Sequence, residues 1–181
     1  MTTVRVVGTG LLGTSIGMAL SAKGFRVQLH DTSPTSVALA RDLGAGEVGD
    51  DPADVVVVAT PPDVAASVVA QQLRDQPEAV VTDVASVKQT VLEELRAAVG
   101  GDALARYVGS HPMAARADLF EGRTWVLCPH ETTADRARAV IDEIARAAGA
   151  SVVTMPAAEH DLAVAAVSHL PQVAASLVAA R

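Results

Sequence analysis

The sequence predicts an α/β fold in which helices cover both faces of a mostly parallel sheet. Apolar runs of strand length alternate with segments of helical period along most of the 181 residues, which is the pattern of a parallel sheet. A glycine-rich turn connects the first apolar run to the first helical segment, and Asp31 ends the second run. Half of the residues are apolar but only 2% are aromatic, so we expect a core built mainly from Val, Leu, Ile and Ala.

The individual elements follow from the apolar runs and from the residues that start and stop helices. Ser33 and Pro34 provide an N-cap and a proline at the first helical position. Glycines such as Gly24, Gly44 and Gly149 are expected helix stops. We expect strands at residues 4–7, 26–30, 55–59, 79–83, 107–109, 124–128 and 151–154. We expect helices at residues 11–23, from Pro34 to Gly44, at 87–98 and at 133–148.

The last segment, residues 157–181, has helical period and contains Pro171, which should kink the helix. Such a helix cannot bury its apolar face alone. We therefore expect a dinucleotide-binding domain at residues 1–155 and, at residues 156–181, the first helix of a truncated, all-helical domain for dimerisation and substrate binding. A homodimer through this region is the expected assembly.

Composition argues against several kinds of partner and site. The net charge is −7 without a basic cluster, which disfavours nucleic acid and an anionic membrane surface and leaves a small molecule as the expected ligand. Cys128 is the only cysteine, so we expect neither a disulfide nor a metal site. The start of the chain lacks the features of a secretory signal, which predicts a cytoplasmic location. Polar residues interrupt the apolar stretch at 162–180, which favours a buried helix over a membrane span.

The glycine-rich turn has the context of a dinucleotide-binding loop. Its sequence, Gly-Thr-Gly-Leu-Leu-Gly, follows a strand and opens a helix. In such loops one glycine makes the tight turn, one lets the backbone approach the pyrophosphate, and one lets helix and strand pack closely. The loop therefore predicts a Rossmann-type domain, with the dinucleotide held by Gly8, Gly10, Leu11, Leu12 and Gly13.

Two further positions are expected to contact the cofactor. Asp31 follows Gly13 by 18 residues, where a carboxylate can accept hydrogen bonds from the adenosine ribose and repel a 2′-phosphate. This favours NAD over NADP. Thr60 and Pro61 follow the strand at 55–59, at the edge where open α/β sheets bind ligands, although a plain proline turn would also explain them.

Three other stretches carry groups that suit chemistry. Asp-Val-Ala-Ser-Val-Lys occupies residues 83–88, Gly-Ser-His-Pro-Met occupies 109–113, and Ser-His-Leu-Pro-Gln occupies 168–172. Together with the glycine loop, these stretches resemble the prephenate and arogenate dehydrogenase family of tyrosine biosynthesis. The resemblance extends over nearly the whole chain. It implies NAD-dependent oxidative decarboxylation of prephenate to 4-hydroxyphenylpyruvate, or of arogenate to tyrosine.

The resemblance also implies roles for particular residues. His111 would take the proton from the substrate's ring hydroxyl as hydride departs, and an imidazole with a pKa near ~6.5 suits that role. Ser86 would hydrogen-bond near the same hydroxyl. His169 would contact the substrate, and Gln172 would do so in a place where many relatives have a second histidine.

Each of these residues also has a structural interpretation. Ser86 alone would be read as a helix N-cap, His111 as the end of a strand, and His169 as a core histidine. Lys88 is expected to be solvated. The other histidines, His30, His130 and His160, match no motif and are expected at the surface.

The chain departs from the family pattern in two places. Ala114 is followed almost at once by an Ala-Asp-Leu-Phe stretch, where the family has about ten more residues, a length typical of a functional loop. The chain given also ends at Arg181, before the family's substrate-binding arginine. If the chain is complete as given, we expect it to bind NAD with poor or no turnover. The alternatives are another two-domain dehydrogenase, of the β-hydroxyacid dehydrogenase or imine reductase type, and a non-catalytic NAD-binding regulator.

Overall fold

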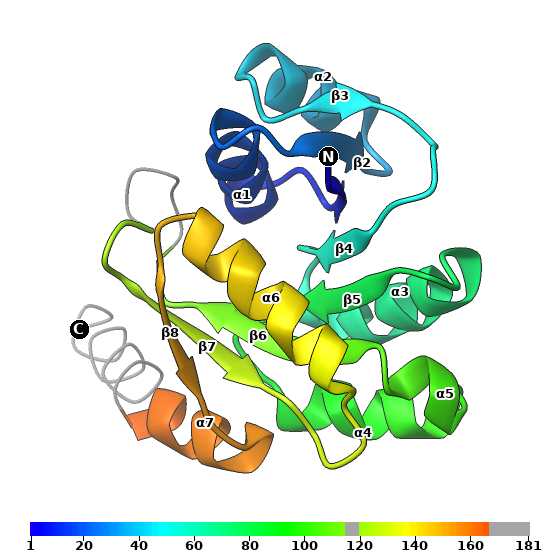
Figure 1. The fold of residues 1–181 in the computed structure, drawn as a ribbon, viewed down its shortest axis with the longest axis vertical. Helices are drawn as coiled ribbons and strands as arrows, with labels where there is room; N and C mark the ends of the chain where they lie inside the picture. Colours follow the sequence, from blue (N-terminus) through cyan, green and yellow to red (C-terminus); the bar gives the residue numbers. More distant parts are fainter. Residues whose placement is uncertain (115–119, 167–181) are drawn as a thin grey trace, which may run out of the picture.

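The computed structural model describes residues 1–114 and 120–166. Within them the chain forms one eight-stranded sheet with the order β3-β2-β1-β4-β5-β6-β7-β8 (Figure 1). Neighbouring strands are parallel except β6 and β7, which are antiparallel. The strands are β1 (Thr3–Val7), β2 (Arg26–His30), β3 (Glu47–Val48), β4 (Val55–Val58), β5 (Val80–Asp83), β6 (Tyr107–Pro112), β7 (Thr124–Cys128) and β8 (Ser151–Thr154). The predicted Rossmann-like α/β class is therefore confirmed.

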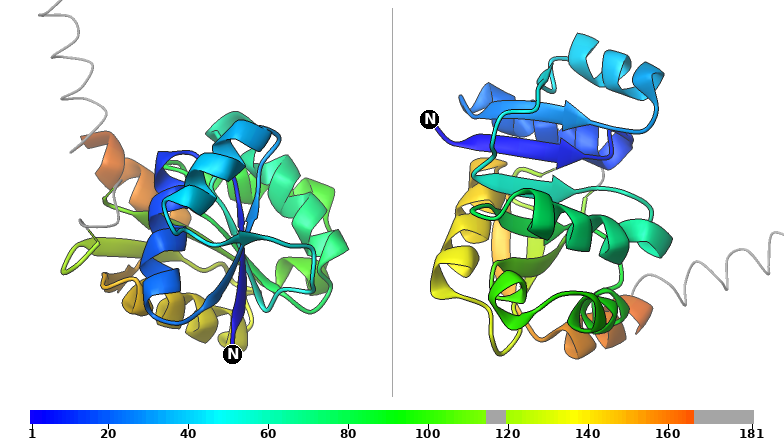
Figure 2. Two further views of the ribbon diagram at one scale, coloured as in Figure 1. Left: turned by 90° about the horizontal axis from the view of Figure 1, so that it is seen from above. Right: turned by 90° about the vertical axis from the view of Figure 1, so that its right-hand side faces the viewer.

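Helices cover both faces of this sheet (Figure 2). They are α1 (Leu11–Ala22), α2 (Pro34–Asp42), α3 (Pro62–Asp75), α4 (Gln89–Ala98), α5 (Gly101–Leu104), α6 (Asp135–Ala147) and α7 (Ala157–Val164). Two hydrophobic cores result, one beneath α1, α2 and α6 and the other beneath α3, α4, α5 and α7. The β4 strand shows why: Val55 and Val57 enter the first core, whereas Val56 and Val58 enter the second, because successive side chains of a strand point to opposite faces.

The structure adds to the predicted elements and shifts several of their boundaries, two of which bear on the site. It adds β3, which is too short to produce an apolar run, and the helices α3 and α5. The β6 strand continues to Pro112 instead of ending at Gly109, because its last residues pair with β7 beyond the end of β5. The α4 helix begins at Gln89 instead of Val87, because the carboxylate of Asp161 in α7 accepts the N–H groups of Lys88 and Gln89 and so caps the helix there.

Only the first part of the predicted C-terminal helix is described. The expected kink at Pro171 lies outside the described residues, as do His169 and Gln172. The division into two domains at residue 155 stays a prediction. Among the helices that the structure describes, none combines the length and the apolar character needed to cross a membrane.

Candidate functional site

The carboxyl ends of the central parallel strands lie at one edge of the sheet, and backbone hydrogen bonds hold the loops that follow them together. The N–H of Gly8 donates to the carbonyl of His30 at 2.8 Å, and that of Ala59 donates to Val7 at 2.7 Å. One strand further along, the N–H of Val84 donates to Val58 at 3.1 Å. This is the edge at which open α/β sheets bind ligands.

The glycine loop leaves no room for side chains at two of its glycines and leaves open space at the third. Gly8 has φ +97°, and a Cβ there would lie 2.5 Å from the Ala59 carbonyl oxygen. A Cβ on Gly13 would lie 1.9 Å from the Gly8 carbonyl oxygen. A Cβ on Gly10 would meet nothing within 4 Å. Gly8 and Gly13 are therefore required for the shape of the loop, whereas Gly10 exposes backbone at the start of α1, where an anion binds well.

Asp31 stabilises this loop from the end of β2. Its Oδ2 accepts hydrogen bonds from the backbone N–H of Thr9 at 2.6 Å and from the Thr9 hydroxyl at 3.0 Å, and its Oδ1 accepts from the N–H of Ser33 at 2.9 Å. Burial alone would raise the pKa of Asp31, but these hydrogen bonds outweigh it and lower the pKa below its usual value. The carboxylate is therefore charged at neutral pH.

A cavity of about 1090 Å³ opens beside the loop. It is lined by all but one of the predicted cofactor residues, namely Gly8, Gly10, Leu11, Leu12, Asp31, Thr60 and Pro61. Gly13 is the exception, because it is buried beneath the loop. Two lining residues also carry buried polar atoms without a hydrogen-bond partner among the described residues, Thr60 Oγ1 and Gln72 Oε1. Buried polar atoms normally have partners, so this cavity suits a large ligand with polar groups.

His111 lies at the same edge of the sheet, on the part of β6 that extends beyond β5. Asp83, the last residue of β5, pairs with Gly109, so His111 is two residues past that end and pairs instead with Val126 of β7. The predicted catalytic histidine is therefore in a strand, and its side chain is only partly buried.

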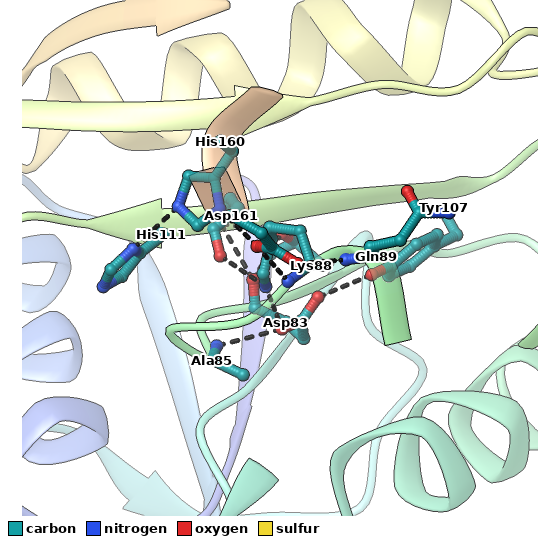
Figure 3. A network of polar contacts seen from close by, with 10 residues as sticks. Asp83, Ala85, Lys88, Gln89, Tyr107, His111, His160 and Asp161 are labelled. Atoms are coloured by element: carbon teal, nitrogen blue, oxygen red, sulfur yellow. Dashed lines mark hydrogen bonds and ion pairs between the residues drawn. The ribbon is translucent and has the colours of Figure 1, made fainter. Parts of the chain in front are cut away.

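The His111 side chain is hydrogen-bonded to α7 (Figure 3). Its Nδ1 lies 2.9 Å from Nε2 of His160, whose Nδ1 lies 2.8 Å from Oδ1 of Asp161. His160 is 1% exposed, so the expectation that it lies at the surface is wrong. The reason is its position on the helix: it shares the buried face of α7 with Ala157 and Val164. That spacing of three and four residues is the sequence signal that would have placed it inside.

Asp161 also explains where α4 begins. Its Oδ1 accepts a hydrogen bond from the N–H of Lys88 and its Oδ2 accepts one from the N–H of Gln89, both at 2.9 Å. This caps the helix from another element, so Ser86 is not the N-cap that its sequence position suggested. Ser86 is exposed in the loop after β5, at the same sheet edge as His111. The two are predicted to act together, but no hydrogen bond joins them in the described structure.

Lys88 was expected to be solvated, but it is buried, with only 1% of its surface exposed. Its ammonium forms an ion pair with Asp83 and donates to the Ser110 carbonyl at 2.8 Å. The other Asp83 oxygen accepts from the Tyr107 hydroxyl at 2.6 Å. Burial, together with the nearby Asp83 charge, raises the pKa of Tyr107 well above its ordinary value, so this hydroxyl remains a donor. The partners that Asp83 needs inside the protein explain why Lys88 turns inward.

Of the remaining two histidines, only His130 differs from expectation. His130 is 7% exposed, and its Nε2 lies 3.1 Å from the Leu104 carbonyl. Burial lowers the pKa of His130 below its usual value. His30 is partly buried and lines the cofactor cavity, with Nε2 2.6 Å from the Gly49 carbonyl. In the described part of the chain, no group of three or more ligating side chains could hold a metal ion.

Replacing Lys88 with Met should test the buried ion pair. The substitution leaves the Asp83 carboxylate buried without its cation, so we expect the free energy of unfolding to fall by roughly 3–5 kcal/mol. The double variant Asp83→Asn, Lys88→Met should be more stable than Lys88→Met alone, because no buried charge remains. Urea denaturation of the three proteins measures both effects, and equal stability of Lys88→Met and the wild type would contradict this account.

Comparison with known proteins identifies relatives along the whole chain. Residues 16–154 match the family model described as "Prephenate dehydrogenase, nucleotide-binding domain". A probable prephenate dehydrogenase of Streptomyces niveus is 41% identical over 190 residues, which cover 100% of this chain and 52% of that protein. Prephenate dehydrogenase of Bacillus subtilis is 30% identical over 97% of this chain and 53% of its own length. The chain thus spans about half the length of these curated relatives.

Solved structures give the same result. Prephenate dehydrogenase of Aquifex aeolicus, in complex with hydroxyphenyl propionate and NAD+, superposes with a TM-score of 0.85 at 26% identity over 99% of this chain and 69% of that one. Arogenate dehydrogenase of Synechocystis superposes with a TM-score of 0.84 at 28% identity, again over 99% of this chain and 69% of that one. The chain therefore belongs to the prephenate dehydrogenase family and contains its nucleotide-binding domain.

Proposed function

We propose that this chain binds NAD and supplies the catalytic histidine of an enzyme that oxidises and decarboxylates prephenate or arogenate. The observation that carries the proposal is the position of His111, at the sheet edge where the glycine loop and its cavity also lie. Family membership supports the reaction class, since the relatives are named as prephenate, arogenate and cyclohexadienyl dehydrogenases.

The loop residues fit NAD. Gly10 offers open backbone at the N-terminus of α1, where the pyrophosphate would lie. Asp31 is charged and lines the cavity, so it can accept hydrogen bonds from ribose hydroxyls and would repel the 2′-phosphate of NADP. Its oxygens already bind Thr9 and Ser33, but each carboxylate oxygen has more than one acceptor site. Bound NAD would take up the hydride that the substrate releases.

The protein's own part in the reaction is proton transfer and positioning. His111 would accept the proton of the substrate's ring hydroxyl while the hydride leaves the same carbon and the ring carboxylate departs as carbon dioxide. Ser86, exposed in the neighbouring loop, would hydrogen-bond to that hydroxyl. His169 and Gln172 would bind the rest of the substrate, and the segment that carries them would form the homodimer. A neutral imidazole is a competent base at neutral pH.

Replacing His111 with Asn should separate catalysis from cofactor binding. Asn keeps a polar side chain but cannot take up a proton, so we expect kcat with prephenate or arogenate to fall by about 10²–10⁴-fold. The dissociation constant for NAD should not change. Absorbance of NADH measures the first quantity in the full-length protein, and titration calorimetry measures the second.

His130→Asn is the matched control for this experiment. His130 follows β7, which runs antiparallel to β6, so it lies at the opposite edge of the sheet from His111. The folded control should therefore retain kcat. If wild type and His111→Asn bind NAD equally but neither turns over prephenate or arogenate, the protein is a regulator or a different dehydrogenase, and the proposed reaction is wrong.

Replacing Gly10 with Ala should test the cofactor loop. The new methyl group meets no protein atom but occupies the space where the pyrophosphate would approach, so we expect NAD to bind at least tenfold more weakly while the fold is retained. Gly100→Ala is a close control, because Gly100 is also an extended N-cap without neighbours within 4 Å but lies outside the cavity. Titration calorimetry on both variants checks the prediction, which fails if they lose affinity equally.

A further inference from the structure

The hydrogen bonds of His111 continue into α7 through two residues that had no role in the proposed reaction. His160 bridges His111 and Asp161, with ring nitrogens 2.9 Å from His111 Nδ1 and 2.8 Å from Asp161 Oδ1. The rings of His111 and His160 meet edge to face, at an interplanar angle of 75°. Because His160 is 1% exposed, water does not replace either contact. A continuous chain of side chains therefore runs from the protein interior to His111.

The charge of Asp161 determines which nitrogens of this chain carry protons. Burial alone would raise the pKa of Asp161, but hydrogen bonds from the Gln89 N–H, the His160 ring and the Lys88 N–H lower it below the usual value. Asp161 is therefore an ionised carboxylate, which can only accept hydrogen bonds. It follows that His160 carries a proton on Nδ1.

When His160 is neutral, the position of that proton also determines the tautomer of His111. A neutral His160 protonated on Nδ1 has a lone pair on Nε2. The 2.9 Å contact with His111 Nδ1 must then be a hydrogen bond donated by His111. A neutral His111 protonated on Nδ1 has its lone pair on Nε2, the ring nitrogen that does not contact His160. The alternative is a positively charged His160, which would donate to His111 Nδ1 and place the proton of a neutral His111 on Nε2.

We propose that His160 and Asp161 are positioning residues that hold His111 in the Nδ1-protonated tautomer, so that Nε2 is the nitrogen that accepts the proton of the substrate hydroxyl. The inference rests on the proposed function, because it assigns His111 as the base. When His111 takes up the proton on Nε2, its positive charge lies at one end of a chain whose other end is a carboxylate. The carboxylate stabilises that charge and orients the ring, as in other catalytic groups in which an acid holds a histidine.

Asp161 links this chain to the loop that contains Ser86. The same carboxylate that holds His160 also accepts the N–H groups of Lys88 and Gln89, and these residues directly follow that loop. Among the residues that the structure describes, the neighbouring ionisable groups include the Asp83–Lys88 ion pair, the Tyr107 hydroxyl bound to Asp83, and Cys128 of β7. Burial raises the pKa of the Cys128 thiol to about 12, so this thiol is neutral and contributes no charge beside the two histidines.

Substitutions at His160 break the hydrogen-bonded chain from Asp161 to His111 but leave the cap of α4 intact, because Asp161 remains in place. His160→Leu cannot accept a hydrogen bond, so we expect kcat to fall by roughly 10²-fold, the scale of a misplaced general base. His160→Gln presents an amide oxygen that can accept from His111 Nδ1, so it should recover about tenfold of that loss. The KM for NAD should stay the same in both variants.

The pH profile distinguishes charge stabilisation from a structural role. Removing the carboxylate in Asp161→Asn makes protonated His111 less stable, so its pKa falls and the acidic limb of the kcat profile moves to lower pH. Glu159→Gln is the matched control, since it removes one negative charge from an exposed position on the same helix. Its profile should stay at the wild-type position. A drop in kcat in Asp161→Asn without any shift would overturn the proposed charge stabilisation.

Nitrogen-15 NMR of the histidine-labelled full chain reads the tautomer directly and does not depend on turnover. The two-bond proton–nitrogen correlations should show a proton on Nδ1 of both His111 and His160, with assignments from His111→Asn and His160→Gln. His111 protonated on Nε2 in the wild type would overturn the inference. If the wild type shows the Nδ1 tautomer but turns over neither prephenate nor arogenate, the proposed function is wrong, whereas the proposed hydrogen-bonded chain from Asp161 through His160 to His111 is still supported.

Discussion

The arrangement of the site depends on the buried ion pair between Asp83 and Lys88. Asp83 ends the central strand β5, and its carboxylate binds the Lys88 ammonium, the N–H of Ala85 and the hydroxyl of Tyr107. The Lys88 ammonium reaches on to the carbonyl of Ser110, the residue before His111. This single pair therefore joins the end of β5, the start of α4 and the part of β6 that carries His111.

An ion pair at this depth is not explained by stability alone. Taking both charges out of water is costly, and apolar residues of similar size often stabilise a protein as well or better. The pair restricts the conformation of the strand ends and loops that it joins, because a carboxylate and an ammonium that each bind several fixed partners can be accommodated in few arrangements. The hydroxyl of Ser110 adds to this, since it donates to the Asp83 carbonyl at 2.9 Å. The backbone beside His111 is thus held by two hydrogen bonds of Ser110, as its proposed catalytic role requires.

Two sets of contacts meet at the carboxyl edge of the sheet. On one side, Asp31 and the glycine loop shape the cavity proposed for NAD. On the other, α7 packs against the start of α4 through Asp161 and against His111 through His160. The end of β5 and the loop containing Ser86 lie between the two. The α7 helix begins the segment proposed to bind substrate, so its contacts with His111 connect that segment to the proposed base.

Much of this fold was determined locally and could be read from the sequence. The glycine loop, the apolar strands and Asp31 are recognisable because each requirement is met within a few neighbouring residues: a tight turn, a side-chain period, a carboxylate at a strand end. His111 and Ser86 were found through a resemblance in short motifs, and the comparisons established the family but not the roles of these residues. The short strand β3 was not predicted, because two residues are too few to show the alternation of a strand.

The sequence by itself thus determined the fold class and the residues around the cofactor cavity, whereas only the tertiary structure decided which polar residues are buried. Lys88, His130 and His160 were expected in solvent and lie inside. Charge and polarity favour the surface unless a partner is available, and most of these partners are remote in sequence. The Ser110 carbonyl, which accepts from the Lys88 ammonium, lies 22 residues from Lys88, and His160 lies 49 residues from His111. No local pattern reveals such pairs, because folding alone brings them together.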